Sequence, residues 1–401
     1  MGTLANKCVV LGVSGGIAAY KSAELVRLLV KAGADVHVIM TKAATEFITP
    51  LTLQTLSMNA VHIDQFRLVE HSEIGHISLA DRADLILVAP ATANVMAKVA
   101  NGIADDLLTT TIMASKAKIL FAPGMNTNMW NSPATQENLA KLERYGYHLV
   151  DPASGELACG VWGKGRLAAL EDIMHAVHYH TYDKPLAGKK LVVTAGPTRE
   201  HIDPVRYISN RSSGKMGYAL AFAANILGAD VTLVSGPATA TIPQCAAHII
   251  HVESAAEMLD ATDSAFKDAD ALVMCAAVAD FRPEKCATQK AGKECFDRDI
   301  PFEQNPDIVA TVAKAKGDRL VVGFAAETEE LLAKAQKKMA RKHLDYVVAN
   351  DVSRTDVGFE SDANEVRILG KDGTDRVFPM KSKTELAFDI LRYVFRINEN
   401  Q

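Results

Sequence analysis

The chain has 401 residues, of which 48% are hydrophobic and 23% charged, and its formal net charge at pH 7 is −5. This length favours two domains, each large enough to bury a core. The negative balance argues against non-specific nucleic-acid binding, which requires a basic surface. No apolar run reaches the roughly 20 residues of a membrane-spanning helix, and no secretory signal is recognisable, so we expect a cytoplasmic protein without a membrane partner.

Apolar runs alternate with helical patterns in the first half of the sequence. The predicted strands cover residues 7–13, 35–41, 85–89, 119–122 and 148–150, and a helix is predicted over 18–31. Continuous apolar runs are typical of parallel strands that are buried on both faces. We therefore expect an α/β domain with a doubly wound, flavodoxin-like parallel sheet, whose ligands bind at the carboxyl ends of its strands.

A polar stretch between residues 175 and 190 interrupts this alternation. It contains His175, His178 and His180, which we interpret as solvated linker residues rather than metal ligands, since no acidic or cysteine partner is adjacent. The domain boundary is accordingly predicted near residue 180, which gives domains of residues 1–180 and 181–401.

The alternation restarts after this boundary. Strands are predicted over 190–194, 230–234, 271–275, 320–323 and 346–349, with a helix over 217–227. Residues 365–369 and 376–380 flank Lys371-Asp-Gly-Thr, which is a strong hairpin turn. Ser382 and Glu385 have the spacing of a capping box at the start of a closing helix. The second half is therefore predicted to be another doubly wound, Rossmann-like domain.

The first predicted strand leads into Ser14-Gly15-Gly16 and then into a helix. Glycines allow an anion to approach the backbone, and a helix N-terminus supplies free N–H donors. The dinucleotide fingerprint GxGxxG is absent, so a mononucleotide phosphate fits better than NAD. A plain tight turn is the alternative for this loop in isolation.

Other candidate residues follow later strands. Residues 90–94 and 123–130 each carry asparagines after a proline, and an asparagine side chain offers both a donor and an acceptor. His76 precedes a predicted helix, with Asp81 and Asp84 close in sequence. Cys159 lies in the glycine-dense segment 158–166, which we expect to be irregular and to act as an active-site lid.

These motifs resemble those of FMN-binding cysteine decarboxylases, a family that includes phosphopantothenoylcysteine decarboxylases. The resemblance rests on residues 14–21, 75–77, 90–94, 123–130 and 158–166. It implies that His76 is the catalytic base, that Asn126 orients the substrate carboxylate and that Cys159 returns a proton. FMN would oxidise the thiol-bearing carbon and so provide an electron sink for the loss of CO₂. The implied FMN contacts are Ser14, Gly15, Gly16, Thr41, Thr92 and Asn94.

An anion-binding pattern also stands at the start of a helix in the second half. Ser212, Ser213 and Lys215 precede this helix, but Met216 breaks the Walker spacing, which disfavours an ordinary P-loop ATPase. Asp280 follows a buried strand, where it is placed to hold Mg²⁺ or a nucleotide amino group. Lys290 lies in a glycine-bearing polar loop that is typical of a mobile cover over a triphosphate.

This half resembles phosphopantothenate–cysteine ligases over residues 195–200, 203–208, 210–217, 276–280, 305–308 and 323–328. The resemblance implies CTP as a substrate together with Mg²⁺, whose ligands stay unassigned. Asn210 and Arg206 would stabilise an acyl-nucleotide intermediate, and Lys290 would support its formation. The implied nucleotide contacts are Met274, Cys275, Ala276, Asp280, Pro306, Asp307, Ile308, Val309, Phe324, Lys338 and Lys342.

Together, the two resemblances predict a bifunctional enzyme of coenzyme A biosynthesis. It would join cysteine to 4′-phosphopantothenate and then convert the product to 4′-phosphopantetheine. The alternatives are an enzyme similar to flavin prenyltransferases and a non-catalytic, flavin-binding regulator. The resemblance also implies a homo-oligomer with trimeric flavin domains and dimeric ligase domains, hence a dodecamer.

Overall fold

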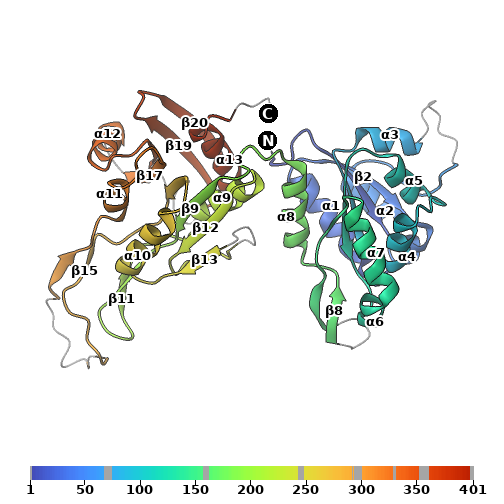
Figure 1. The fold of residues 1–401 in the computed structure, drawn as a ribbon, viewed down its shortest axis with the longest axis horizontal. Helices are drawn as coiled ribbons and strands as arrows, with labels where there is room; N and C mark the ends of the chain where they lie inside the picture. The colour runs from blue at the N-terminus through green and yellow to red at the C-terminus, as the bar shows by residue number, and fades with distance from the viewer. Residues whose placement is uncertain are drawn as a thin grey trace. The chain divides into compact units, whose positions relative to one another are not determined.

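The computed structural model describes residues 2–66, 75–156, 162–242, 248–290, 292, 300–327, 331–351 and 361–397. The chain divides into two compact units, Met1–Tyr182 and Asp183–Gln401 (Figure 1). This division falls two residues from the boundary predicted by the sequence. Within the described ranges, no helix combines the length and the apolar composition that crossing a membrane requires.

The N-terminal unit is built on a six-stranded parallel sheet with strand order β3-β2-β1-β4-β5-β6. Because the chain moves outward from β1 in one direction and then returns to continue from β4 in the other, the sheet is doubly wound, as predicted. The strands are β1 (Cys8–Val13), β2 (Asp35–Met40), β3 (Val61–His62), β4 (Leu85–Ala91), β5 (Lys118–Pro123) and β6 (His148–Leu149).

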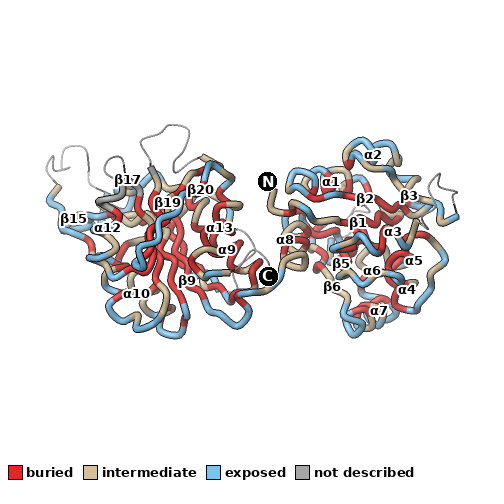
Figure 2. The backbone as a smooth tube through the Cα atoms, turned by 90° about the horizontal axis from the view of Figure 1, so that it is seen from above, coloured by how far each residue is buried: buried red, intermediate tan, exposed pale blue. Residues whose placement is uncertain are grey.

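Helices cover both faces of this sheet, and β1, β2, β4 and β5 are buried over most of their length (Figure 2). Val9, Leu11 and Val13 of β1 belong to one core cluster, whereas Val10 belongs to the other. The alternation follows from the two-residue period of a strand. The helices are η1 (Ile17–Lys21), α1 (Ser22–Lys31), η2 (Lys42–Glu46), α2 (Pro50–Ser57), α3 (Gly75–Arg82), α4 (Ala93–Ala100), α5 (Leu107–Ala114), α6 (Thr127–Asn131), α7 (Pro133–Arg144) and α8 (Leu170–Thr181).

Two predictions about this unit were wrong. The glycine-dense segment was expected to be irregular, but β8 (Trp162–Arg166) pairs in antiparallel fashion with β7 (Ala153–Glu156). The supposed linker begins as the helix α8, whose His178 is only 7% exposed. Its ring atom Nδ1 lies 2.7 Å from the carbonyl oxygen of Met174, and Nε2 lies 2.8 Å from Oγ1 of Thr3.

The sequence contained a signal for α8 that the linker prediction overlooked. Leu170, Ile173 and Val177 recur at intervals of three and four residues, and all three are buried in the core. Such spacing is typical of an amphipathic helix. The histidines obscured this apolar stripe because their polar character resembled that of a solvated segment, although the ring of His180 stacks on that of His148 at 3.9 Å.

The C-terminal unit contains an eight-stranded sheet with order β13-β12-β9-β14-β17-β18-β19-β20. The first six of these strands are parallel, and the last two continue the sheet in antiparallel fashion. The predicted hairpin joins them, and Gly370 N donates to Thr374 O at 2.9 Å. The strands are β9 (Lys190–Ala195), β12 (Asp230–Ser235), β13 (His248–His251), β14 (Ala271–Met274), β17 (Leu320–Glu327), β18 (Tyr346–Asp351), β19 (Ala363–Gly370) and β20 (Asp375–Ser382).

Helices again pack on this sheet, and short two-stranded ribbons extend from it. The rings of Phe222 on α9 and Phe388 on α13 meet edge to face, and the predicted capping box of Ser382 and Glu385 starts α13. The helices are α9 (Lys215–Ile226), α10 (Ala255–Phe266), α11 (Ile308–Ala313), α12 (Leu331–Arg341) and α13 (Lys383–Val394). The ribbons pair β10 (Arg199–His201) with β11 (Tyr207–Ser209) and β15 (Phe281–Pro283) with β16 (Phe302–Gln304).

The buried His178 predicts how the stability of the N-terminal unit depends on pH. Burial lowers the pKa of His178 from its ordinary value of 6.5. In the unfolded chain the ring takes up a proton once the pH falls below about 6.5, whereas the folded unit resists protonation. The free energy of unfolding therefore decreases as the pH falls from 6.5 towards the lower pKa of the folded state.

Thermal unfolding at about pH 7.5 and about pH 5.5 tests this prediction, since these values bracket the ordinary histidine pKa. The difference between the two midpoints is expected to shrink in His178→Gln and to persist in the control His175→Gln. An equal difference in wild type and His178→Gln would contradict it.

Candidate functional sites

The loops after β1 and β4 meet at the point where the strand order of the N-terminal sheet reverses. Ser14, which begins the first of these loops, is fully buried. Its Oγ donates to Pro90 O at 2.6 Å and accepts from Thr92 N at 2.9 Å. Ser14 therefore links the two loops by hydrogen bonds, and the backbones of both loops lie at the carboxyl edge of the sheet.

The predicted glycine loop packs closely against a neighbouring segment, as its glycine content suggests. A Cβ at Gly15 would lie 2.5 Å from the Cβ of Ala43, so a side chain there would displace the loop from η2. Gly16 has no such contact and lines a cavity instead. The loop thus depends on its first glycine for packing, while its second glycine leaves room for a ligand.

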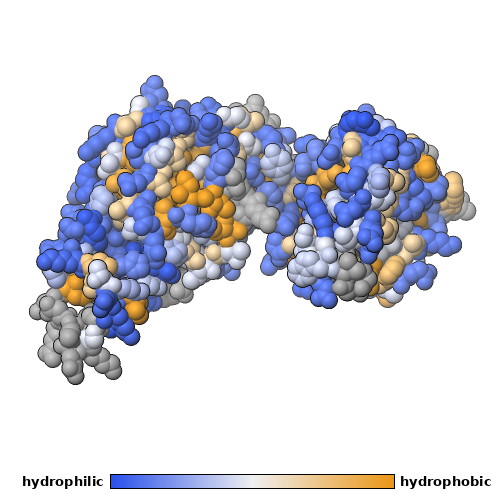
Figure 3. All heavy atoms as spheres, turned by 60° about the horizontal axis from the view of Figure 1, so that its bottom comes forward, coloured by the Kyte–Doolittle hydropathy of each residue, from blue (hydrophilic) through white to orange (hydrophobic). Residues whose placement is uncertain are grey.

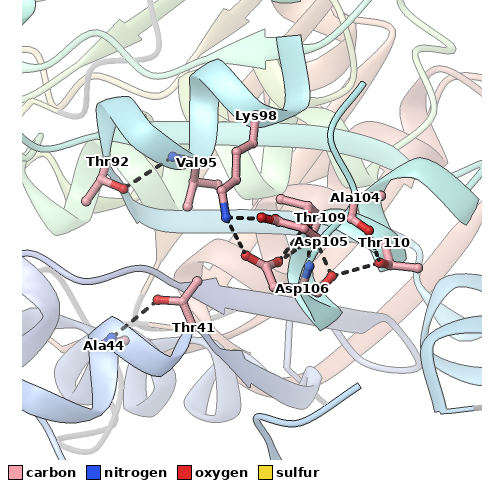
Figure 4. A network of polar contacts seen from close by, with 10 residues as sticks. All are labelled: Thr41, Ala44, Thr92, Val95, Lys98, Ala104, Asp105, Asp106, Thr109 and Thr110. Atoms are coloured by element: carbon pink, nitrogen blue, oxygen red, sulfur yellow. Dashed lines mark hydrogen bonds and ion pairs between the residues drawn. The ribbon is translucent and has the colours of Figure 1, made fainter. Parts of the chain in front are cut away.

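Thr41 and Thr92 hold the helices that begin beside this loop (Figure 4). The side chain of Thr41 accepts from Ala44 N at the start of η2, and that of Thr92 accepts from Val95 N at the start of α4. Figure 4 also shows Lys98 of α4 paired with Asp105 and Asp106 in front of α5. N-caps of this kind satisfy backbone donors that a helix start otherwise leaves unpaired.

A cavity of about 720 Å³ opens over these strand ends. This volume lies within the range of small-molecule and cofactor sites. Two cationic side chains, those of Lys21 and Arg166, stand among its lining residues. The lining consists of Gly15, Gly16, Ile17, Ala18, Tyr20, Lys21, Thr92, Gly124, Met125, Asn126, Met129, Glu156, Gly165, Arg166 and Leu167.

The hairpin of β7 and β8 forms one wall of this cavity. Gly165 has a positive φ of 134°, and a Cβ there would lie 2.6 Å from the carbonyl oxygen of Met125. Met125 N donates to Gly165 O at 2.9 Å, which fixes the hairpin against the loop after β5. Cys159 lies between the two strands in sequence, but outside the described residues.

The predicted residues of the first half are only partly brought together. Gly15, Gly16, Thr92 and Asn126 line the cavity, while Ser14 lies beneath it; Thr41, His76 and Asn94 are not among the lining residues. His76 is the second residue of α3, and its Nδ1 atom is buried with no hydrogen-bond partner in the part of the chain that the structure describes.

Asp84 lies close to His76 in sequence, but it has a different partner in the structure. Its carboxylate accepts from Cys8 N at 2.7 Å, at the opposite end of β1 from the glycine loop. Lys21 and Arg166 were missed as lining residues. Both are the last residues of quoted motifs, and their positive charge was the signal that could have found them.

The C-terminal unit repeats the same arrangement on its larger sheet. The strand order reverses between β9 and β14, and a cavity of about 310 Å³ lies at the carboxyl ends of the central strands. Asn210 lines it, and its Nδ2 donates to Ala277 O at 2.8 Å. The lining consists of Gly196, Asn210, Ser212, Ser213, Gly214, Lys215, Met216, Gly217, Cys275, Ala276, Ala277, Val278, Phe324, Ala325, Asn350, Asn364 and Lys383.

The thiol of Cys275 is unreactive at neutral pH in this cavity. Burial raises the pKa of its thiol to about 12, although the charge of Lys383 acts in the opposite direction. A thiol with that pKa stays protonated at neutral pH and is a poor nucleophile. Cys275 therefore contributes shape and backbone groups rather than covalent chemistry.

A second group of predicted nucleotide contacts lies around α11 and α12. Lys338 Nζ donates to Phe324 O at 2.7 Å, so this group adjoins the cavity through Phe324. Lys342 Nζ lies 2.8 Å from Asp307 Oδ2 at the start of α11. Ile308 and Val309 are buried in the core, so only their backbones can face a ligand, and neither they nor Pro306 or Met274 line the cavity.

Three further predicted residues lie outside the cavity lining. Arg206 NH1 lies 3.4 Å from the buried carboxylate of Asp203. Asp280 and Lys290 are exposed, and the backbone oxygen of Asp280 accepts from Asn305 N at 2.8 Å. Lys383, Asn350 and Asn364 were missed, and no local motif could have revealed them, because they reach the site from distant strands and a helix.

The two units together define a class of protein: two doubly wound α/β units, each with a glycine-bearing loop and a cavity at its topological switch point. Family models assign the same division. Residues 2–181 match the model described as Flavoprotein, and residues 186–397 match that of the DNA/pantothenate metabolism flavoprotein C-terminal domain.

Relatives that match over nearly their whole length define the family more narrowly. The chain is 47% identical over 99% of its length to the Coenzyme A biosynthesis bifunctional protein CoaBC of Bacillus subtilis (strain 168), and covers 98% of that protein. It is 46% identical to the protein of the same name from Escherichia coli (strain K12), with 96% of each chain covered. The chain belongs to this family of bifunctional coenzyme A biosynthesis proteins.

Solved structures resemble the units separately. A crystal structure of the C-terminal domain of a CoaBC protein is 38% identical and covers 54% of this chain and all of that one, with a TM-score of 0.46. A PPC decarboxylase mutant in complex with pantothenoylaminoethenethiol is 32% identical over 43% of this chain and 96% of that one, with a TM-score of 0.39.

The hydrogen bonds of Ser14 to the loop after β4 lead to a prediction about stability. Ser14→Ala leaves the amide of Thr92 without its acceptor, and an unsatisfied buried donor costs about 1–3 kcal/mol. We expect a loss of that size in the free energy of unfolding of the N-terminal unit, measured by urea denaturation. The control Thr55→Ala, on an exposed helix face, is expected to change it by less than about 0.5 kcal/mol. Equal effects of the two substitutions would refute the assigned role.

Proposed function

We propose that the N-terminal unit binds FMN in its 720 Å³ cavity. Gly15, Gly16 and Thr92 would hold the phosphate, with Lys21 and Arg166 supplying positive charge. Apolar side chains such as Leu167 offer the ring a surface. Thr41 and Asn94, which are not lining residues, would support the loop around it or contact parts of the cofactor outside the cavity.

The reaction that we assign to this unit is the decarboxylation of phosphopantothenoylcysteine. FMN, held by Gly15, Gly16 and Thr92, would supply the reversible hydride-transfer chemistry that the loss of CO₂ requires. Asn126 would hold the substrate carboxylate by hydrogen bonding. His76, whose buried Nδ1 has no partner among the described residues, would accept a proton from the substrate, and Cys159 would return one at the end.

For the C-terminal unit we propose the ligation of cysteine to 4′-phosphopantothenate. An oxygen of the substrate carboxylate attacks the α-phosphorus of CTP, and pyrophosphate leaves. The cysteine amine then attacks the resulting acyl-cytidylate, so that CMP departs and the amine loses a proton. Asn210 and Arg206 would stabilise the acyl-nucleotide and Lys290 would support its formation, with Mg²⁺ and the lysines neutralising phosphate charge.

The nucleotide base and ribose would lie towards α11 and α12. The remaining predicted contacts gather there: Lys338 donates to the backbone of Phe324, and Lys342 pairs with Asp307. Asp280 adds an exposed carboxylate at the same edge of the sheet, where it would bind Mg²⁺ or an amino group of the base. CTP, rather than another nucleoside triphosphate, remains part of this proposal.

One observation carries this function: the chain matches a bifunctional relative over 99% of its own length and 98% of that protein. In agreement with this match, each half contains its own cavity at a switch point. A flavin prenyltransferase or a flavin-binding regulator would need no second cavity. We therefore prefer the two-step pathway enzyme to both alternatives.

A homo-oligomer is part of the same proposal. Apolar side chains are exposed on both units (Figure 3), among them Ile17, Tyr20 and Met129 at the rim of the first cavity. Large apolar side chains at the rim of a site are typical of surfaces that a partner covers. His76 does not line the cavity of its own unit, so a second copy of the chain would be needed to bring it to a substrate there.

Replacement of Cys159 tests the decarboxylase half. In Cys159→Ser, CO₂ release from phosphopantothenoylcysteine is expected to continue, while the final reduction stops for lack of the proton donor. An enethiol would then accumulate, as measured by mass spectrometry of the products. Cys8→Ser, at the other end of β1, serves as the control. Normal formation of phosphopantetheine by Cys159→Ser would remove the assigned role.

Replacement of Asn210 tests the ligase half. Asn210→Ala should slow pyrophosphate release from CTP by about 10²-fold or more, because a donor to the developing charge is lost. The flavin absorbance and the decarboxylation of added phosphopantothenoylcysteine provide the internal control and are expected to stay unchanged. Wild-type rates of pyrophosphate release in the variant would exclude the role of Asn210.

A further inference from the structure

One buried asparagine joins two segments that carry predicted nucleotide contacts. Asn305 lies between β16 and α11, immediately before Pro306, and is only 7% exposed. Its backbone N–H donates to Asp280 O at 2.8 Å, and its side-chain Nδ2 donates to Ala279 O at 2.9 Å. Asn305 therefore fixes two successive carbonyl groups of the segment that follows β14.

The acceptor atom of the same side chain also has a protein partner. Arg282 NH1 donates to Asn305 Oδ1 at 2.9 Å, and Arg282 Nε donates to Glu303 Oε1 at 2.9 Å. An amide side chain has one acceptor oxygen and one donor nitrogen, so these partners determine its orientation. Both polar atoms of the Asn305 side chain thus act on the protein itself, and its effect on a ligand has to be indirect.

A second buried side chain holds the same residue of the β14 segment. Thr198, which is fully buried, accepts from Ala279 N through its Oγ1 at 3.0 Å. Ala279 thus has its N–H bound to Thr198 and its carbonyl bound to Asn305. Asp280, the next residue, is exposed. A carboxylate on a backbone that is fixed in this way is preorganised, because little freedom of the backbone is left to lose on binding.

We propose that Asn305 is a positioning residue of the ligase. It sets the carboxylate of Asp280 against residues 306–309, and so determines how tightly the nucleotide binds without contacting it. This inference rests on the proposed ligase function, in which both segments contact the nucleotide. Thr198 supports the same geometry through Ala279. Loss of either side-chain hydrogen bond to Ala279 should therefore weaken the binding of CTP, while the steps after binding stay nearly unchanged.

Asn305→Asp tests the proposal in the full-length chain. The carboxylate has the size of the amide and keeps an acceptor for Arg282, but it cannot donate to Ala279 O. Calorimetric titration with CTP, without the other two substrates, should show an affinity about 10-fold weaker than wild type, as expected for one lost hydrogen bond. In assays of pyrophosphate release the KM for CTP should rise similarly, whereas kcat and the KM for 4′-phosphopantothenate should change by less than about 2-fold.

Three further variants make the test specific. Gln304→Glu introduces the same charge one residue away, on an exposed side chain, and is expected to bind CTP like wild type. Thr198→Val removes the other hydrogen bond to Ala279 without a change of charge and should reproduce the effect of Asn305→Asp. In an Asp280→Asn background, Asn305→Asp should weaken binding by a smaller factor than it does alone, because it acts largely through that carboxylate.

The possible results decide between this role and a purely structural one. A loss of affinity for CTP both with and without Mg²⁺ assigns Asp280 to the nucleotide itself, and a loss only with Mg²⁺ assigns it to the metal; either supports the positioning role. Wild-type affinity in both Asn305→Asp and Thr198→Val overturns it. So do unfolding of both variants in circular dichroism, an equal loss of affinity in Gln304→Glu, and an equal rise in the KM of every substrate.

Failure of the proposed function would look different. Wild-type protein itself would then release no pyrophosphate from CTP in the presence of both other substrates. Where wild type does release it, the comparison of Asn305→Asp with Gln304→Glu tests the positioning role alone.

Discussion

The reversal of strand order beside the first strand of each sheet is the constraint on which both sites depend. Where neighbouring strands send their following helices to opposite faces, the loops diverge and leave a crevice at the carboxyl edge. In the N-terminal unit this crevice lies over β1 and β4, and in the C-terminal unit over β9 and β14. Each sheet thus forms one crevice at its carboxyl edge without a special element.

Each crevice is stabilised by a polar side chain that connects the two diverging loops. Ser14 does this in the first unit, through Pro90 and Thr92. Thr194 plays the corresponding part in the second, since its Oγ1 accepts from Ala276 N at 3.1 Å. A hydroxyl suits this position because it both donates and accepts within a small volume. The backbone that would contact phosphate is therefore held rigidly before a ligand arrives.

The two cavities differ in how they accommodate positive charge. Lys21 and Arg166 are at least partly accessible to water at the first cavity, so their charges cost little without a ligand. Lys383 is buried in the second, where burial, followed by the charge of Lys215, lowers its pKa.

Local patterns in the sequence determined most of the fold and the anion loops. Apolar runs specify buried strands, and the Ser382 capping box acts within a few residues, so both can be read without a structure. Local reading failed for His178, because its environment comes from Thr3 at the other end of the unit. Only the tertiary structure brought Lys383 to Lys215, since residues 168 positions apart become neighbours through sheet order and helix packing, which no local spacing encodes.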